Sequence, residues 1–450
     1  MSNELKPLHF DADYTMEEAL AEAKRCLNCP RPLCQMGCPI ENEIPRFIQA
    51  IAHGNFGLAN DILAERTNLP SICGRVCPRE NQCEGNCIMN KAKKPPINIG
   101  KLERFAADFE SINELRKPKK IKQDLGKVAV VGSGPAGLSV AGDIAKLGYE
   151  VTVFEGQSEP GGVLLFGIPE FRLSKSVVRR EIARLEGLGV KFVCNTFIGQ
   201  DKTLDELFAE GFDSIFIGTG THIPQEVRME NDEVHGVFQA MYLLTNVQLV
   251  ENGELDAEQI PVKKGDRVII IGGGNVAMDA ARTCVRLGCE SVTVAYRRSQ
   301  EQMPALLSEY EEARAEGVQF QWFASPVGVE GKDKVEGFKY EVMALNEDGA
   351  GIHGTGKFQV MPVDKIIIAA GHKPNARLIG EGNNLKVDEK GYIITSEDPY
   401  GMTNRDGVFA GGDVVHKPAT VVLAMREAKK AVDGMVKYME IKKAQESANQ

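Results

Sequence analysis

The sequence contains few aromatic residues and few histidines, and it has no long apolar run. Aromatic residues make up 6% of the 450 residues, with one tryptophan, and there are seven histidines. Neither a Ser-His-Asp nor a Cys-His arrangement is visible, so we expect no catalytic side chain of the nucleophilic type. Because no apolar run reaches the roughly 18 residues that cross a bilayer, we expect no membrane-spanning helix.

The charge balance argues against nucleic acid as a partner. The formal net charge is −10 and 43% of the residues are hydrophobic, which suits two or three domains with real cores. The basic run Arg116–Lys122 is interpreted as a solvated linker. The first residues contain no apolar signal region, so a cytoplasmic protein without a membrane partner is expected.

Cysteine is concentrated at one end, with eight of the eleven cysteines between Cys26 and Cys87. The spacings are C-x2-C-x4-C-x3-C-P and C-x3-C-P-x4-C-x3-C. Zinc ribbons would show pairs of C-x2-C, and no histidine lies at ligand spacing, so zinc is disfavoured. Proline after a ligand cysteine and tight, irregular spacings are typical of ferredoxin-type sequences. Eight cysteines would by arithmetic hold two all-cysteine iron–sulfur clusters. A short helix is expected over Thr15–Arg25, capped by Thr15, and a helical stretch over Ile44–Ala64.

A complete dinucleotide fingerprint occupies Lys127–Glu155. The strand Val128–Val131 leads into Gly-x-Gly-x-x-Gly, an Ala/Leu-rich helix and the strand Glu150–Phe154, which ends at an acid. Its glycines allow a tight turn, a close approach to pyrophosphate and close packing of helix on strand. The helix N-terminus offers free N–H groups to phosphate, and Glu155 stands where a carboxylate would bind ribose hydroxyls.

A second fingerprint follows at Arg267–Ala295, with Ala277 in place of the third glycine. Glu155 lies 23 residues after Gly132, and the same offset from Gly272 reaches Ala295, which is followed by Tyr-Arg-Arg. The acid that would bind a free 2′-hydroxyl is therefore missing. Because arginines Arg297 and Arg298 suit a 2′-phosphate, we expect NADP(H) rather than NAD(H).

Small residues also end several buried strands. Asp213–Gly220 and Lys365–Ile368 with Ala369–Asn375 are expected to be strands followed by glycine-rich turns beside a cofactor. Val408–Asp413 is an apolar strand that ends in Gly-Asp, and a helix is expected over Thr420–Lys437. The remaining cysteines include Cys284 and Cys289, expected on nearly opposite faces across a helix end and packed rather than redox-active.

These motifs, in this order, resemble those of one family over nearly the whole chain. The cysteine spacings, GRVCP, the CEGNC run and IGKLERF resemble the N-terminal domain shared by three groups. These are glutamate synthase small chains, dihydropyrimidine dehydrogenases and large subunits of NADH-dependent ferredoxin:NADP oxidoreductases. The longer gap in CPRENQC is more similar to the last two groups and to a subset of glutamate synthase small chains.

The resemblance implies two [4Fe–4S] clusters whose ligands cross between the two cysteine groups. One cluster would use Cys26, Cys29, Cys34 and Cys87, and the other Cys38, Cys77, Cys83 and the carboxylate of Glu103, which leaves Cys73 spare. It also implies that the Gly-Gly-x-Leu and GIP-x-FRL segments lie along FAD, and that the Gly-Asp motif binds its ribitol. The cofactor-binding candidates are thus Gly132, Gly134, Pro135, Ala136, Gly137, Glu155, Gly162, Leu164, Gly220, Gly272, Gly274, Asn275, Ala277, Arg297, Arg298, Gly371, Gly412, Asp413 and Thr420.

We therefore predict an α/β protein in which a helical iron–sulfur domain (1–125) precedes two Rossmann-like domains. The FAD domain would comprise 126–240 and 365–450, and the NADP(H) domain, 241–364, would be inserted in it. The expected function is electron transfer from NADPH through FAD and two clusters to a partner, as in a glutamate synthase small chain with its large chain. The alternatives are the large subunit of a ferredoxin:NADP oxidoreductase, with a ferredoxin-reductase-like small subunit or ferredoxin as partner, and a flavin disulfide reductase or redox sensor.

Overall fold

The computed structural model describes residues 14–112, 121–347, 349, 351–374, 384–417 and 420–448. The described chain forms two compact units. The first-sheet unit contains residues up to 165, then 172–223 and 373 onward, and the second-sheet unit contains 166–171 and 224–372. Residues 116–120 of the basic linker, and Asn375, lie outside the described residues.

The helical region begins the first-sheet unit. Its helices are α1 (Met16–Lys24), α2 (Leu33–Met36), α3 (Ile44–Ala52), α4 (Phe56–Arg66), α5 (Pro70–Val76), α6 (Ile88–Lys91) and α7 (Ile99–Ile112), with a 3-10 turn η1 (Arg79–Asn81). The predicted capping of α1 is confirmed, because Thr15 and Glu18 each accept a hydrogen bond from the other's backbone N–H. The fully buried side chains of Phe47, Ile48 and Leu102 form part of its core.

The predicted single helical stretch over 44–64 is two helices. Gly54, at φ +74°, ends α3, and its N–H donates to the carbonyl of Ile51. Asn55 then caps α4, because its Oδ1 accepts from the N–H of Leu58 at 3.0 Å. A left-handed glycine followed by an N-cap residue therefore reverses the chain where the apolar pattern alone suggested continuity.

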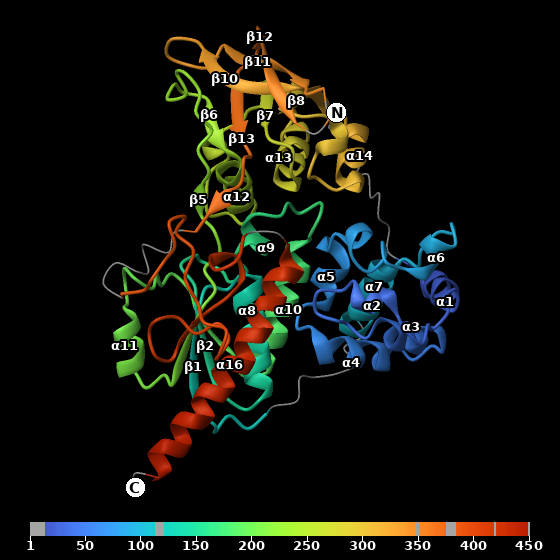
Figure 1. Ribbon diagram of the computed structural model, residues 1–450, viewed down its shortest axis with the longest axis vertical. Helices are drawn as coiled ribbons and strands as arrows, with labels where there is room; N and C mark the ends of the chain where they lie inside the picture. Colours follow the sequence, from blue (N-terminus) through green and yellow to red (C-terminus); the bar gives the residue numbers. More distant parts are fainter. Residues whose placement is uncertain are drawn as a thin grey trace. The chain divides into compact units, whose positions relative to one another are not determined.

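The first sheet is parallel, with strand order β15-β4-β1-β2-β3. Its elements are β1 (Lys127–Val131), α8 (Pro135–Lys146), β2 (Glu150–Phe154), α9 (Val163–Phe166), α10 (Lys175–Gly187), β3 (Lys191–Val193), α11 (Leu204–Ala209), β4 (Ser214–Ile217), β15 (Val408–Ala410), the 3-10 turn η4 (Gly412–Val414) and α16 (Val421–Ala448). Figure 1 shows α16 running along α8. The central strand β1 is buried except at its first residue, as expected for a sheet covered by helices.

The helical region is held to the first sheet by polar contacts inside the same unit. Asn68 donates to Asp143 of α8 at 2.8 Å, and a methyl group on the neighbouring Gly142 would lie 2.5 Å from the Asn68 side chain. Asp108 of α7 pairs with Arg75 at 2.5 Å and with Arg180 of α10. These contacts, together with packing of α5 against α10 and α16, join the cysteine-bearing helices to the first nucleotide fingerprint.

The second-sheet unit contains a parallel sheet of order β6-β13-β7-β8-β9 and an antiparallel sheet β10-β11-β12. Its elements are β6 (Val237–Gln239), α12 (Ala240–Glu251), η2 (Ala257–Gln259), β7 (Arg267–Ile271), α13 (Asn275–Arg286), β8 (Ser291–Tyr296), η3 (Gln300–Gln302), α14 (Leu307–Ala315), β9 (Gln319–Trp322), β10 (Ala324–Glu330), β11 (Gly337–Leu345), β12 (Ile352–Pro362) and β13 (Lys365–Ile368). The short strands β5 (Ile223–Pro224) and β14 (His372–Lys373), where the chain enters and leaves this unit, pair with each other.

The predicted fold class is confirmed: a helical region precedes two Rossmann-like sheets, and the second is inserted between β4 and β15. The predicted boundary at residue 365 was wrong, because β13 pairs with β6 and β7 of the second sheet. The inserted unit also begins earlier than 241, since β6 belongs to it, and it includes 166–171. No helix in the described part of the chain is long and apolar enough to cross a membrane.

Candidate functional site

The first fingerprint forms the predicted strand–turn–helix. β1 ends at Val131, Gly132 adopts φ +94°, and Gly134 is the N-cap residue of α8. A methyl group on Gly137 would lie 1.9 Å from the carbonyl oxygen of Gly132, so only glycine fits this position without a backbone shift. A methyl group on Gly134 would meet nothing within 4 Å. The backbone N–H groups of Ala136 and Gly137 in the first turn of α8 thus adjoin open space, which fits a pyrophosphate, whereas Pro135 has no N–H to offer.

Glu155 lies directly after β2, next to the end of β1, as predicted. Its Oε2 accepts hydrogen bonds from the backbone N–H and the hydroxyl of Ser133 at 3.0 and 2.5 Å, and its Oε1 accepts from the N–H of Gln157 at 2.9 Å. It is only 9% exposed. A carboxylate can accept about four hydrogen bonds, so this arrangement orients Glu155 and leaves capacity for ribose hydroxyls.

Ser133 is a site residue that the sequence analysis missed. Its hydroxyl also accepts a hydrogen bond from the N–H of Gly161 at 2.8 Å. The following Gly162 adopts φ +51°, and a methyl group there would lie 2.9 Å from the Cα of Gly134. The only sequence signal was a hydroxyl residue between the first two glycines of the fingerprint. Ser133 therefore links the acid, the fingerprint and the Gly-Gly loop.

The other first-sheet candidates gather at the same helix N-terminus. Gly412 adopts φ +76°, and a methyl group on it would lie 2.7 Å from the Cβ of Ala136. Burial raises the pKa of the neighbouring Asp413 to about 6. Thr420 caps α16 through its hydroxyl, which accepts from the N–H of Leu423 at 3.3 Å. The arrangement fits FAD, because two helix N-termini and a buried acid stand at one edge of the sheet.

Three further candidates, Gly220, Leu164 and Gly371, have distinct environments. Gly220 adopts φ +69° and a methyl group on it would meet open space, so it leaves room beside the end of β4. The side chain of Leu164 is fully buried, and its carbonyl accepts from the Nζ of the buried Lys175 at 3.1 Å. Leu164 thus packs in the protein interior. Gly371 lies in the second-sheet unit, where its carbonyl accepts from the N–H of Gln225 at 2.9 Å.

The second fingerprint repeats this geometry at the start of α13. Gly272 adopts φ +141°, with a methyl position 2.4 Å from the carbonyl of Ala369, and Gly274 is the N-cap residue facing open space. Ala277 is fully buried. Asn275 uses its Oδ1 to accept from the N–H of Leu306 at 2.9 Å, so this side chain holds the loop after β8. The open helix N-terminus fits a second dinucleotide.

Beside this fingerprint, β8 ends without an acid. Ala295 is buried, whereas Arg297 and Arg298 are exposed. The ring of Tyr296 fills the space over Gly273, where a methyl group would lie 2.6 Å from it, and its hydroxyl donates to the carbonyl of Gln302 at 3.1 Å. Because Ile271 pairs with Ala295 as Val131 pairs with Phe154, Tyr296 holds the place of Glu155, and the two arginines follow it directly.

The eight cysteines of the helical region fall into two spatial groups. The first group lines a cavity of about 30 Å³ together with apolar residues, and its members are Cys26, Cys29, Cys34 and Cys87. Burial, with the neighbouring thiols, raises the pKa of Cys34 to about 11. Four thiols that line one cavity have the donor chemistry of an iron–sulfur cluster.

The second group contains five candidate donors, which are Cys38, Cys73, Cys77, Cys83 and Glu103. Burial raises the pKa of Cys38 to about 11 and that of Glu103 to about 8. At Glu103 the positive charge of Arg79 acts in the opposite direction and lowers the pKa. Glu103 also accepts from Asn42 at 3.4 Å. Thiols and one carboxylate suit an iron–sulfur cluster with an oxygen ligand. Among the described residues, no group of three or more His, Cys, Asp or Glu has its side chains placed so that it could hold a metal ion.

Cys73 lies at the edge of the second group. Its thiol contacts that of Cys77 and the hydroxyl of Thr67, and it lies 3.8 Å from the sulfur of Met425 in α16. This contact between two sulfur atoms thus connects the second cysteine group with α16, the helix whose N-terminus lies beside the first fingerprint. Both Cys73 and Glu103 therefore lie beside Cys38, Cys77 and Cys83.

The expectation that Cys284 and Cys289 lie on nearly opposite faces was wrong. Gly288, at φ +83°, ends α13, and the N–H of Cys289 donates to the carbonyl of Cys284 at 3.3 Å. This six-to-one bond is that of a Schellman motif, which brings the two flanking side chains together. The thiols hydrogen-bond to each other, and this contact with burial raises the pKa of Cys284.

Comparisons with known proteins agree with this geometry. Residues 6–115 match the family model described as dihydropyrimidine dehydrogenase domain II, 4Fe-4S cluster, and residues 126–428 match pyridine nucleotide-disulphide oxidoreductase. The glutamate synthase [NADPH] small chain of Escherichia coli (strain K12) is 37% identical over 94% of this chain and 92% of that protein. The chain belongs to the family of the glutamate synthase [NADPH] small chain.

The names of the related proteins refer to different enzymes. The NAD-dependent dihydropyrimidine dehydrogenase subunit PreT of Escherichia coli (strain K12) is 34% identical over 95% of this chain and 96% of that protein. Mycobacterium tuberculosis FprA in complex with NADPH matches with a TM-score of 0.58 at 20% identity, covering 72% of this chain and 86% of that one. The family member described here is thus an NADPH-dependent oxidoreductase with a 4Fe-4S domain and an FAD- and NADP-binding fold.

Proposed function

We propose that this chain is the electron-input subunit of a two-subunit enzyme of the glutamate synthase type. FAD would occupy the first fingerprint and NADPH the second. When bound, FAD would accept a hydride from NADPH and release single electrons to two [4Fe–4S] clusters, from which a partner subunit receives them. The observation that supports this order is that both cysteine groups and the first fingerprint belong to one compact unit.

The roles of the protein's own residues follow from the site. Ser133 and Glu155 would orient the ribose of FAD, and the N-termini of α8 and α16 would face its phosphates and flavin. Arg297 and Arg298 would bind the 2′-phosphate of NADPH. Thiols and one carboxylate would hold the clusters, as Cys26, Cys29, Cys34 and Cys87 for one and Cys38, Cys77, Cys83 and Glu103 for the other.

The domain limits proposed from this arrangement follow the two sheets. The helical iron–sulfur domain would end near residue 112, and the FAD domain would comprise the first sheet with its helices. The NADP(H) domain would run from about 224 to 372, as the second-sheet unit does. Residues 167–171 of the GIP-x-FRL segment belong to that unit, whereas Arg172 and Leu173 belong to the first-sheet unit, and the whole segment is still proposed to lie along FAD.

The ligand assignment has its own test in two single variants. Glu103→Ala is expected to lose or convert one cluster, whereas Cys73→Ala is expected to keep both. Iron and sulfide content, with electron paramagnetic resonance of the dithionite-reduced protein, measures the outcome. If Glu103→Ala kept both spectra and Cys73→Ala lost one, Cys73 would be the ligand in place of Glu103.

The function is tested by anaerobic affinity purification from the source organism, followed by mass spectrometry. We expect a large glutaminase-containing chain to co-purify. A different observation, the CPRENQC spacing, favours a second candidate, the large subunit of a ferredoxin:NADP oxidoreductase. That candidate predicts a small flavin and iron–sulfur reductase subunit, or ferredoxin, in the same experiment, and its recovery would contradict the first proposal.

A further inference from the structure

Two cysteines outside the helical region meet at the end of α13 in the second-sheet unit. Cys284 is fully buried in the core of this unit, and Cys289, which is partly buried, packs against the same core. Their thiols hydrogen-bond to each other. The proposed function uses neither thiol, and Cys194, the remaining cysteine outside the helical region, belongs to the first-sheet unit. The pair therefore stands apart from the groups assigned so far.

The backbone holds the two residues together independently of their side chains. In the Schellman motif that ends α13, the N–H of Cys289 donates to the carbonyl of Cys284 at 3.3 Å, and the N–H of Gly288 donates to that of Val285 at 3.0 Å. Gly288 adopts φ +83°, a conformation that residues with a Cβ rarely adopt. This turn therefore fixes the spacing of the two thiols.

Hydrogen bonds with the loop before β7 anchor the same turn from outside. The N–H of Gly265 donates to the carbonyl of Gly288 at 3.0 Å, and the N–H of Glu290 donates to that of Asp266 at 3.0 Å. Because the turn is tied at both points, the two sulfur atoms are kept in contact. A bond between them therefore needs little movement of the backbone.

The two thiols differ in access and in protonation. Cys284 has no exposed surface, and its hydrogen bond with Cys289, together with burial, raises its pKa, so it stays protonated at neutral pH. Cys289 is partly exposed, and its thiol also donates to the carbonyl of Lys263 at 3.9 Å. An oxidant in solution can reach Cys289 directly and Cys284 only through it. The exposed thiol would thus react first and the buried thiol second.

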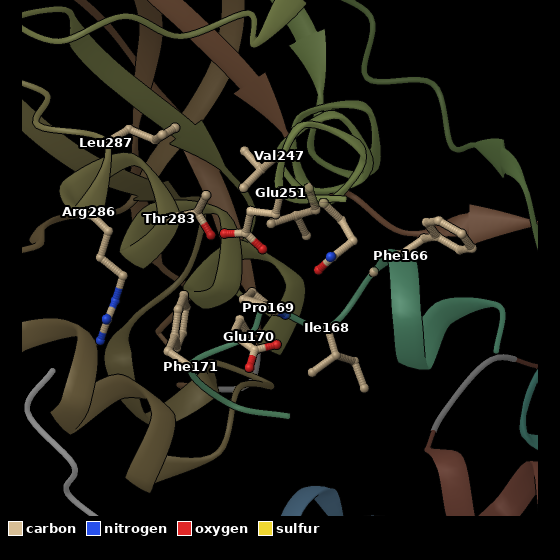
Figure 2. Close-up of a pocket in the computed structure, with 13 residues that line it drawn as sticks. Phe166, Ile168, Pro169, Glu170, Phe171, Val247, Glu251, Thr283, Arg286 and Leu287 are labelled. Carbon is tan, nitrogen blue, oxygen red and sulfur yellow. The ribbon is translucent and has the colours of Figure 1, made fainter. Parts of the chain in front are cut away.

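The cysteine pair is separate from the pocket at the same end of the helix. That pocket, of about 170 Å³, is lined by Arg286 and Leu287 of α13 among other residues, as Figure 2 shows. Neither cysteine belongs to its lining, because Cys284 packs in the core of the unit. The nucleotide fingerprint lies at the opposite end of α13, which begins at Asn275. A bond between the two thiols is therefore a local change.

We propose that Cys284 and Cys289 form a reversible disulfide by exchange with a low-molecular-weight disulfide such as oxidised glutathione. The thiolate of Cys289 attacks one sulfur of the small disulfide, whose S–S bond breaks, and the first small thiol leaves with the Cys289 proton. Cys284 then attacks the sulfur of Cys289, and the second small thiol leaves with the Cys284 proton. The two cysteines lose two electrons, which reduce the small disulfide to two thiols. An excess of the small thiol reverses the exchange.

The modification would lock the turn between α13 and β8. A bond that closes a loop of six residues limits the conformations of the unfolded chain. The oxidised second-sheet unit should therefore unfold at a midpoint about 5 °C higher than the reduced one. The thiol–disulfide balance of the surroundings thus sets the stability of this unit. Because the pair contacts none of the proposed cofactor-binding residues, the inference does not depend on the proposed function.

The test treats the full-length protein, purified anaerobically with its cofactors, with oxidised glutathione under argon. Free thiols are then blocked with N-ethylmaleimide in denaturant. Trypsin cleaves between the two cysteines at Arg286, so they fall in separate peptides, 283–286 and 287–297. We expect mass spectrometry to find these peptides joined in most chains, and separate when dithiothreitol precedes the blocking step. Full alkylation of both cysteines after the oxidant, or glutathione retained on Cys289 of the parent, would overturn the proposal.

Three variants locate the reaction. Cys284→Ser should leave glutathione attached to Cys289, because the second thiol is missing, and Cys289→Ser should leave Cys284 unmodified, because that thiol is buried. Cys194→Ser is the matched control and should form the joined peptides as the parent does. Trp322 in β9 of the same unit reports the thermal midpoint by its fluorescence.

Oxidation should raise this midpoint by about 5 °C in the parent and in Cys194→Ser, and should leave it unchanged in Cys289→Ser. The Cys289→Ser variant alters a partly exposed side chain, so the comparison holds even if Cys284→Ser, a change in the core, fails to fold. An equal rise in Cys289→Ser, or modification of Cys284 in that variant, would contradict the assigned pair.

Discussion

The first and second sheets use the same strand–glycine–helix unit and differ where β2 and β8 end. In the first, Glu155 is buried and receives hydrogen bonds from Ser133 and Gln157. In the second, strand register puts Tyr296 at the corresponding place, because Ile271 pairs with Ala295 as Val131 pairs with Phe154, and the following arginines are exposed. One framework therefore offers a fixed acceptor in one copy and exposed positive charge in the other.

The third position of the fingerprint shows a second difference. A methyl group at Gly137 would lie 1.9 Å from the carbonyl of Gly132, whereas Ala277 already carries a methyl group, fully buried, at the equivalent place. Helix and strand thus approach more closely in the first sheet. Equivalent fingerprint positions in the two sheets therefore tolerate side chains of different size, because the local packing around each position differs.

The largest effect is expected when Gly137 of the first fingerprint is replaced by alanine, the residue at the equivalent position of the second fingerprint. Gly137→Ala forces the backbone at Gly132 to move and is expected to destabilise the first-sheet unit by about 3 kcal/mol. FAD retained after gel filtration, and the midpoint of thermal unfolding, measure the loss. The reciprocal change, Ala277→Gly, removes one methyl group and lowers helix propensity, at a cost of about 1–2 kcal/mol.

The lone tryptophan, Trp322, lies in β9 and so reports on the second-sheet unit, while flavin fluorescence reports on the first. Gly137→Ala should therefore change flavin fluorescence first, and Ala277→Gly should change Trp322 fluorescence first. Similar losses in the two variants, or full FAD retention by Gly137→Ala, would show that the close contact at Gly132 is not the constraint that we infer.

The next effect concerns the two arginines. Replacing Arg297 and Arg298 together by alanine should raise the KM for NADPH about 10- to 100-fold, because hydrogen bonds to a charged phosphate contribute about 1.5–3 kcal/mol. NADH lacks the 2′-phosphate and serves as the matched control, with an unchanged KM. Steady-state reduction of an artificial acceptor measures both. A parallel rise of both KM values would mean that the arginines act on the fold and not on the phosphate.

A smaller effect is expected from Ser133. Ser133→Ala removes the hydrogen bonds that its hydroxyl makes with Glu155 and Gly161, and should raise the Kd for FAD about ten-fold. Ser139→Ala in the following helix α8 is the control, because the Oγ of Ser139 is buried and has no hydrogen-bond partner among the described residues, so its removal should be neutral. Fluorescence titration of the FAD-free protein gives both constants. Equal effects of the two variants would remove Ser133 from the site.

Local motifs were predictable from sequence because their chemistry is contained in a few neighbouring residues. The strands, glycines and helix of both fingerprints, the absence of an acid after β8 and the cap at Thr15 follow directly from residue type and spacing. The grouping of cysteines from both ends of the helical region was anticipated only through the family resemblance. Spacing by itself permitted other pairings.

Features that depend on tertiary pairing were missed or misplaced. The run Lys365–Ile368 is equally apolar in either sheet, so its pattern could not reveal that it pairs with β7. The contact of Cys284 with Cys289 depends on a left-handed glycine between them. Phe171 lies in the GIP-x-FRL segment that the family resemblance placed along FAD, but nothing local indicated that it stacks on arginines more than 100 residues later.

The smallest effect tests a contact that both sheets share. The N–H of the first residue of each central strand donates to an aspartate before the neighbouring strand, Lys127 to Asp213 at 2.8 Å and Arg267 to Asp364 at 2.9 Å. In the second sheet, the Arg267 guanidinium adds two bonds of 2.9 Å. This hydrogen-bonded pair lowers the pKa of Asp364 from 3.8 to about 2.

Arg267→Lys would make the second sheet like the first at this point. Both side chains are about 40% exposed, so the loss of stability at pH 7 should stay below about 1 kcal/mol. Because the folded-state pKa of Asp364 is depressed, the stabilisation is fully present above about pH 4 and disappears as the pH falls toward 2. Urea midpoints from Trp322 fluorescence at pH 7, 4 and 2.5 should therefore converge for the two proteins only at the lowest pH. A difference that persisted undiminished at pH 2.5 would show that Arg267 stabilises β7 through packing of its planar guanidinium group and not through its hydrogen bonds to the ionised Asp364.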